Sequence, residues 1–154
     1  MTLSIIRGLP GSGKSTFARD HFPGVFHVEN DMFHVTDGKY MFDQKKCQRV
    51  FGTVLSMVEM TLRLGADVTV SNVFMKLSSI SRFVVLAREI GANVEIYQMA
   101  GQNFGDVHWV PSNVKASMER GFADIPANSD FDWPKVKYIY PLNFGSYEIL
   151  EEKK

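Results

Sequence analysis

The chain has 154 residues, no formal net charge and 45% hydrophobic residues. This length and composition predict one globular domain, residues 1–154, that buries a core without disulfides. Basic and acidic side chains number 17 each, so the protein has no net positive charge that would attract polyanions. Nucleic-acid binding would therefore need a local basic patch. The single Cys47 excludes an internal disulfide, and the sequence has no apolar run of membrane-spanning length. We therefore expect a cytoplasmic protein without a membrane partner.

Short apolar runs alternate with helical patterns, which is typical of an α/β fold with one doubly wound, mainly parallel sheet. Strands are predicted where these runs are bounded by turn residues: 2–7, 25–28, 67–71 and 93–99. Two later segments are also strand candidates, 136–140 and 146–150. Glycine, proline and polar residues predict irregular structure over two stretches, 100–112 and 121–135.

Helices are predicted between these strands, at 14–22, from Asp43 to Gly65, at about 80–90 and at 113–120. The second helix carries an apolar face at a spacing of four: Val50, Val54, Val58 and Leu62. Asp43 is expected to cap its start, and Gly65 lies where a terminating glycine is expected. Ser78 or Ser79 is expected to cap the third helix, which Gly91 ends.

The segment GLPGSGKST (8–16) directly follows the first predicted strand. It fills the pattern G-x-x-x-x-G-K-[ST], in which glycines turn backbone N–H groups toward a phosphate at a helix N-terminus. In this pattern Lys14 contacts the β- and γ-phosphates, and the Ser15 hydroxyl binds Mg²⁺. The sequence thus predicts ATP and Mg²⁺ as cofactors. The expected nucleotide-binding residues are Gly8, Pro10, Gly11, Ser12, Gly13, Lys14, Ser15 and Thr16.

Three segments carry a family resemblance: GLPGSGKSTFAR (8–19), NDMFHVTDGKYMFD (30–43) and SMERGFADIP (117–126). With them the chain resembles P-loop kinases of the polynucleotide 5′-hydroxyl kinase type over about residues 3–126. The resemblance implies a P-loop NTPase three-layer sandwich with a short helical lid at about 112–130. It also implies a kinase that transfers the γ-phosphate of ATP to a hydroxyl. Its partners would be a nucleotide and nucleic-acid 5′ ends.

In that family a carboxylate after the second strand takes the proton of the attacking hydroxyl. The family usually has two adjacent carboxylates there, and this chain has Asn30 and Asp31. Either residue can occupy the position of the base, but only Asp31 can accept a proton; the alternative is a loop aspartate that caps the local backbone. Strand alternation points Glu29 to the opposite face from Asn30. The resemblance places His34 near the substrate phosphate, and Asn30 also among the substrate-binding residues.

Two further positions follow from the resemblance. Arg120 matches a lid arginine that clamps the nucleotide phosphates, and a guanidinium suits that task because it grips two oxygens at once. The alternative is a solvated arginine at a helix end. Where the family has an acidic residue after the third strand, this chain has Ser71 and Asn72, which bring no charge. Asn72 is expected at the substrate, and the metal would rest on Ser15, the nucleotide and Asp31 through water.

Two other functions stay open. A small-molecule or nucleoside kinase would use the same phosphate loop with another acceptor, which the neutral net charge favours. A nucleotide-binding regulatory protein with weak or lost catalysis is favoured by the altered acidic positions, Asn30 and Asn72.

Trp109 and Trp133 lie in predicted irregular stretches, where they anchor a loop to the core or stack on bases.

Overall fold

The computed structural model describes residues 1–101, 110–142 and 145–154. In this part of the chain a six-stranded sheet has the strand order β2-β5-β1-β6-β7-β8. Its strands are β1 Thr2–Arg7, β2 Phe26–Val28, β5 Val68–Asn72, β6 Asn93–Met99, β7 Val136–Pro141 and β8 Tyr147–Leu150. The first five strands in this order, β2, β5, β1, β6 and β7, pair in parallel. The last strand, β8, pairs antiparallel with β7. The mainly parallel sheet predicted from the sequence is confirmed.

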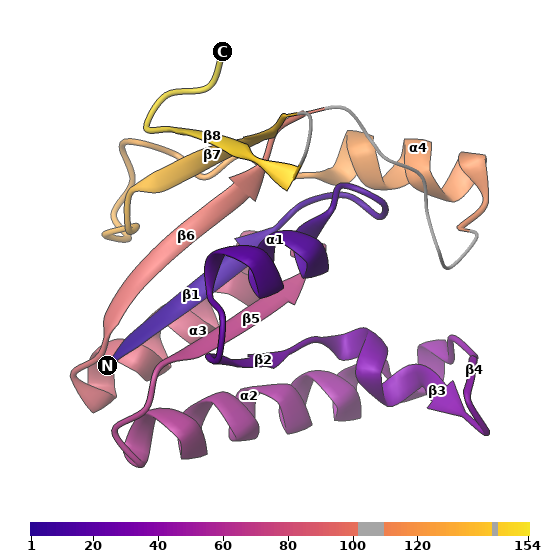
Figure 1. Ribbon diagram of the computed structural model, residues 1–154, viewed down its shortest axis with the longest axis horizontal. Coiled ribbons are helices and arrows are strands. Elements are labelled where there is room, and N and C mark those ends of the chain that lie inside the picture. The colour runs from indigo at the N-terminus through magenta and orange to yellow at the C-terminus, as the bar shows by residue number, and fades with distance from the viewer. Residues whose placement is uncertain (102–109, 143–144) are drawn as a thin grey trace.

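Helices cover both faces of the sheet (Figure 1). They are α1 Lys14–His21, α2 Cys47–Arg63, α3 Leu77–Ile90 and α4 Ser112–Gly121. Helix α1 packs on one face, α2 and α3 pack on the other, and α4 lies beyond the carboxyl ends of the strands. The three-layer, doubly wound arrangement of a P-loop NTPase is therefore confirmed. None of the helices within the described residues has the length and apolar content to cross a membrane.

The sheet separates two hydrophobic clusters of unequal size. The larger cluster lies under α2 and α3, and it buries the predicted face of α2: Val50, Val54, Val58 and Leu62. The smaller cluster lies under α1, where Phe17 packs against Tyr97, Met99 and Ile139. Because successive residues of a strand point to opposite faces, Ile5 enters the larger cluster and Ile6 the smaller one.

The ends of α2 follow the predicted signals. Asp43 caps a 3₁₀ turn, η2 Gln44–Lys46, which runs directly into α2, and its Oδ1 accepts a hydrogen bond from the Lys45 N–H at 2.9 Å. At the other end Gly65 has a φ of 81° and donates its N–H to the Leu62 carbonyl. That left-handed conformation favours glycine, so the helix ends where the sequence predicts.

The predicted start of the third helix is wrong. Helix α3 begins at Leu77 after an N-cap at Lys76, without a side-chain cap, so Ser78 and Ser79 both lie inside the helix. Leu77 packs against the larger cluster, and burying this apolar side chain brings the chain into the helix before the serines. The predicted end is confirmed, because Gly91 has a φ of 83°.

Two segments extend past the carboxyl ends of the strands. Between β2 and α2 the chain forms a 3₁₀ helix, η1 Asn30–His34, and a small hairpin of β3 Val35–Thr36 and β4 Lys39–Tyr40. Helix α4 lies across from this segment, as Figure 1 shows. The two segments stand on either side of the sheet's carboxyl edge, where ligands bind in open α/β sheets.

The irregular stretch after α4 is held to the core by aromatic side chains. Phe131 and Trp133 have ring centroids 4.4 Å apart, and both pack against the larger cluster. This contact favours the anchoring interpretation for Trp133. Trp109 lies outside the described residues.

Candidate phosphate-transfer site

The loop of residues 8–13 connects the end of β1 to the start of α1. Gly13 is the N-cap of α1 with a φ of 86°, a conformation that glycine adopts without strain. At Gly8 a Cβ atom would lie 2.8 Å from the Met99 Cβ, so the loop needs a glycine for close approach to β6. Lys14 Nζ donates to the Leu9 carbonyl at 2.9 Å, which folds its ammonium back over the loop. This is the local geometry of a phosphate cradle.

A cavity of about 810 Å³ opens beside this loop at the carboxyl ends of β2 and β5. Six of the eight predicted nucleotide-binding residues line it: Pro10, Gly11, Gly13, Lys14, Ser15 and Thr16. Gly8 and Ser12 are not in the lining; they belong to the loop, and Gly8 lies against Met99 of β6. The predicted substrate-side residues Asn30, Asp31, His34 and Asn72 line the same cavity. The fold thus brings most of the predicted site together from three separate segments.

Glu29 is the site residue that the sequence analysis missed. The Ser15 hydroxyl donates to Glu29 Oε2 at 2.7 Å, and the Ser71 hydroxyl donates to the same oxygen at 3.0 Å. Strand alternation is used in the sequence analysis to set Glu29 apart from Asn30, but Glu29 lies on the face that carries α1 and lines the same cavity as Asn30. The signal that could have found it is the register of β2 beside β5, because Val28 pairs with Val70 and the next residues of each strand are then neighbours.

His27 completes this polar network behind the phosphate loop. Its Nε2 lies 2.6 Å from the Ser71 Oγ and 3.9 Å from Glu29 Oε2. Burial lowers the pKa of His27, and the nearby Glu29 carboxylate opposes that shift. In this network the Glu29 carboxylate orients two serine hydroxyls, those of Ser15 and Ser71.

Asp31 lies at the start of η1 and lines the cavity. Its Oδ1 accepts a hydrogen bond from the Tyr40 hydroxyl at 3.1 Å, which ties η1 to the hairpin. The neighbouring Asn30 donates its backbone N–H to the Asn72 Oδ1 at 2.8 Å. Two complementary atoms beside them, Asn30 Oδ1 and Asn72 Nδ2, are buried without a hydrogen-bond partner among the described residues. Together these groups offer a proton acceptor and two unused polar atoms.

His34 lines the cavity but is 4% exposed. Its Nδ1 accepts the backbone N–H of Asp43 at 3.3 Å. The ring packs beside Phe42, with centroids 5.1 Å apart. A buried histidine whose Nδ1 already has a backbone partner offers little to a phosphate, and its observed contacts hold the segment before α2.

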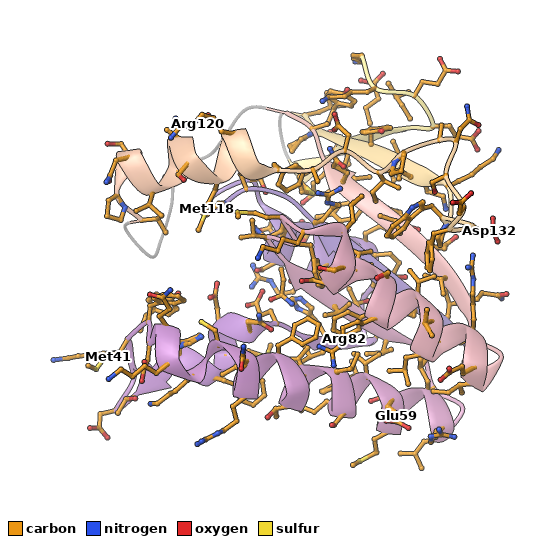
Figure 2. All side chains as sticks on the ribbon, turned by 180° about the vertical axis from the view of Figure 1, so that it is seen from behind. Met41, Glu59, Arg82, Met118, Arg120 and Asp132 are labelled. Atoms are coloured by element: carbon orange, nitrogen blue, oxygen red, sulfur yellow. The ribbon has the colours of Figure 1, made fainter. Side chains whose placement is uncertain are left out.

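Arg120 does not line the cavity. It is exposed in the last turn of α4, and Figure 2 shows it on the opposite side of that helix from Met118. Met118 and Val114, which share one face of α4, do line the cavity. Residues two apart on a helix point in nearly opposite directions, so Met118 and Arg120 cannot face the cavity together. The phosphate clamp at Arg120 stays a prediction that would need α4 to turn.

A buried arginine, which the sequence analysis did not single out, holds the residues after α4 to the loop after β5. Arg7 is the last residue of β1 and is fully buried. Its Nη2 donates to the carbonyls of Phe74 at 3.0 Å and Ala123 at 2.8 Å, and its Cζ lies 4.0 Å from the centroid of the Phe122 ring. Burial lowers the pKa of Arg7 to about 10, so the guanidinium remains charged at neutral pH. Arg7 thus joins the loop after β5 and the residues after α4.

Comparison with known proteins agrees with this site. A family model described as an AAA domain matches residues 3–99, which include the phosphate loop, Asp31 and Asn72. The chain belongs to this AAA domain family. A relative that aligns over most of the chain is also found. This AAA domain protein is 32% identical over 153 residues to the uncharacterized protein PM0531 of Pasteurella multocida strain Pm70. That alignment covers 88% of this chain and 84% of the relative.

Solved structures of other proteins share the fold of this AAA domain. A sugar kinase from Janibacter sp. HTCC2649 superimposes with a TM-score of 0.63 at 13% identity, over 91% of this chain and 85% of the kinase. Chaetomium thermophilum Kti12 in complex with ADP-AlF3 gives a TM-score of 0.65 at 13% identity, over 90% and 88% of the two chains. A chain of the Pnkp1/Rnl/Hen1 RNA repair complex is 26% identical with a TM-score of 0.55, over 64% of this chain and 32% of that one. These matches establish a P-loop kinase-like fold.

Proposed function

We propose that this protein is an ATP- and Mg²⁺-dependent phosphotransferase that acts on a hydroxyl group. The observation that carries the proposal is that one cavity is lined by both Lys14 and Asp31. Phosphoryl transfer requires charge compensation on one side of the transferred group and a proton acceptor on the other. A phosphate loop alone would support nucleotide binding, and Asp31 adds the group that transfer needs.

In the proposed reaction the acceptor oxygen forms a bond to the γ-phosphorus and the bond between that phosphorus and ADP breaks. The acceptor's proton passes to the Asp31 carboxylate. Tyr40 orients this carboxylate through its hydrogen bond to Oδ1. Lys14, which lines the same cavity, would hold phosphate oxygens at the loop. Asn30 and Asn72 supply the unpartnered amide atoms to the acceptor.

The residues at the loop fit a magnesium ion. Ser15 lies in the first turn of α1 and lines the cavity, and its hydroxyl proton is already given to a carboxylate, so its lone pairs are available. Mg²⁺ prefers such oxygen ligands and retains several waters. When bound, the ion neutralises charge on the β- and γ-phosphates.

Our first candidate for the acceptor is a nucleic-acid 5′-hydroxyl end. Its support is the motif resemblance around Asp31 and in SMERGFADIP (117–126), together with the 26% identity to a chain of the Pnkp1 complex. In this reading a terminal nucleotide enters between the hairpin and α4. His34 and Arg120 would contact its phosphate and the γ-phosphate only after rearrangement.

A second candidate is a small hydroxyl compound, and the lining of the cavity favours it. Among the described lining residues the lysines are Lys14 and Lys76, and none is an arginine. Aromatic and aliphatic side chains dominate the acceptor side: Tyr40, Phe42, Phe51, Phe74, Met75 and Met118. A polyanion gains little from such a surface, whereas an uncharged compound with an apolar face can pack on it.

The test is transfer of label from γ-labelled ATP to a panel of 5′-hydroxyl DNA, 5′-hydroxyl RNA, nucleosides and sugars. Asp31→Asn should lower the rate on the best acceptor by about 10²–10⁴-fold, because it keeps the shape and removes the base, and should leave ADP affinity nearly unchanged. Asp37→Asn is the matched control, since Asp37 is an exposed turn residue with a φ of 51°, which asparagine also adopts.

Three outcomes decide among the functions. Labelled 5′ ends support the polynucleotide kinase, and labelled nucleosides or sugars support the small-molecule kinase. If wild type binds ATP but labels nothing, and neither Asn72→Asp nor Asn30→Asp restores transfer, the kinase proposal fails. A nucleotide-binding regulatory protein would then replace it.

A further inference from the structure

We infer that Glu29 organises the bound metal ion, in the role that the family resemblance places after the third predicted strand. This inference rests on the proposed function, because it concerns the metal that accompanies the nucleotide. The position after that strand is held by Asn72, which is uncharged. In this protein the carboxylate comes from the neighbouring strand, at the end of β2.

The contacts of Glu29 are those of a group that positions a metal ligand. The Ser15 and Ser71 hydroxyls both donate to Oε2, at 2.7 and 3.0 Å, and Oε1 receives no hydrogen bond from the described residues. Because Ser15 gives its proton to Glu29, its oxygen lone pairs are free for a cation at the loop. The remaining oxygen, Oε1, can accept hydrogen bonds from metal-bound water.

The strand register explains why Glu29 reaches this point. Val28 pairs with Val70 and is buried on the α2 and α3 side, so the residues that follow each of them lie on the α1 side. These residues are Glu29 and Ser71. Glu29 has extended backbone angles, φ −146° and ψ 153°, so it continues the strand by one residue before η1 turns away. Its side chain is thereby set against the first turn of α1.

Asn72 cannot take this role in the present structure. Its Oδ1 accepts the backbone N–H of Asn30 at 2.8 Å, which fixes the start of η1 beside β5. The remaining atom, Nδ2, is a hydrogen-bond donor and would repel a cation. The residue therefore joins η1 to β5 and leaves metal ordering to a neighbour.

Among the residues the structure describes, the cationic neighbours of Glu29 are limited to His27, whose pKa is lowered by burial. No lysine or arginine lies within ion-pair distance, and the nearest group able to carry positive charge, His27 Nε2, is 3.9 Å away. The side chain is 21% exposed, so the carboxylate is partly removed from water. Such a charge attracts a cation that arrives at the loop with the nucleotide.

The test compares ADP binding with and without Mg²⁺ by calorimetry in wild type and Glu29→Gln. The ratio of the two ADP affinities measures the coupling between metal and nucleotide, and it needs no catalysis. We expect Glu29→Gln to lower this ratio by about 10–100-fold, the usual cost of losing a group that orients a metal ligand. ADP affinity without metal should stay equal or rise, because a negative charge near the phosphates is removed.

Two further variants sharpen the test. Glu95→Gln, another hydroxyl-bonded carboxylate on the same face of the sheet, is the matched control and should keep the wild-type ratio. Adding Asn72→Asp to Glu29→Gln returns a carboxylate to the cavity from β5 and should recover most of the lost coupling. Spin resonance of Mn²⁺ added to the ADP complexes should report the same order of metal affinities.

The outcomes separate the two proposals. A ratio in Glu29→Gln within twofold of wild type, in a variant with a wild-type melting temperature, overturns the inference and leaves the proposed function intact. A loss that Asn72→Asp does not recover overturns the assignment of metal charge to Glu29. If wild type binds no ADP at all, the proposed function fails as well. Ser71→Ala, which keeps the charge and removes one hydroxyl that orients it, should lower the ratio by only a few-fold.

Discussion

Glu29 and Glu95 lie on the same face of the sheet and are held in different ways. Glu95 accepts hydrogen bonds from the Tyr97 hydroxyl at 2.7 Å and from Lys137 Nζ at 2.9 Å. Glu29 accepts two serine hydroxyls, and no lysine or arginine of the described residues reaches it. Both carboxylates are oriented by hydroxyl donors, but among the described residues only Glu95 pairs with a lysine, whereas the neighbour of Glu29 is His27, whose pKa is lowered by burial.

The difference in charge pairing agrees with a different role for each carboxylate. The Glu95 cluster joins β6 to β7 away from the cavity, and its charges balance without any ligand, so its role is structural. Glu29 and its serine partners border the phosphate loop, and no lysine or arginine of the described residues pairs with this carboxylate. A protein keeps an unbalanced, partly buried charge where function requires it, because such a charge contributes little to folding.

The largest expected effect tests which lysine serves the ligand. Lys14→Ala should weaken ADP-Mg²⁺ binding by about 2–3 kcal/mol, since a charge-assisted contact to phosphate is lost. Lys137→Ala should leave that affinity unchanged, because Lys137 balances Glu95 within the fold. Calorimetry of both variants checks this. Unchanged affinity in Lys14→Ala would remove the phosphate cradle from the proposal.

A smaller effect concerns stability without ligand. Glu95→Gln should lower the free energy of unfolding by about 0.5–1 kcal/mol, a value reduced by solvent because the Glu95 side chain is 37% exposed. Glu29→Gln should change it by less than about 0.5 kcal/mol, because it removes no ion pair with a lysine or arginine. Urea unfolding of the two variants measures both values. Equal losses would mean that the two carboxylates are held alike.

The smallest effect is the pH dependence of that stability difference. Burial alone would raise the pKa of Glu95, but the hydrogen bonds from Lys137 and Tyr97 lower it below its ordinary value of 4.5. A lowered pKa stabilises the fold above the unfolded value, and the contribution is lost as pH falls through the folded value. The difference between wild type and Glu95→Gln should therefore be constant from about pH 6 to 8 and should shrink below about pH 4. A difference that persists at pH 3 in urea titrations would contradict the charge pair.

Most of the fold could be predicted because its signals are local. The phosphate loop is a contiguous motif, the face of α2 repeats every fourth residue, and Gly65 and Gly91 end their helices where expected. The start of α3 could not be predicted in this way. Burial of Leu77 against the larger cluster decides it, and that contact depends on elements distant in the sequence.

In the candidate site, too, the residues predicted from local motifs differ from those whose positions depend on tertiary structure. Lys14, Ser15 and Asp31 were predicted from their motifs, and the structure places all three at one cavity. Arg120 was predicted from its motif too, but the rotation of α4 about its axis points it away from the cavity. Met118 and Val114 face the cavity instead, and a short motif carries no information about that rotation.

The sequence by itself determined the phosphate loop, the order of strands and helices and the carboxylate after β2. The tertiary structure decided that Glu29 reaches Ser15, that Arg7 holds the base of α4, and that Asn72 is occupied by the backbone of Asn30. The physical reason lies in how strands assemble. Along one strand the sequence fixes which side chains share a face, but the crossovers decide which strands become neighbours, and β2, β5 and the head of α1 meet only in the folded sheet.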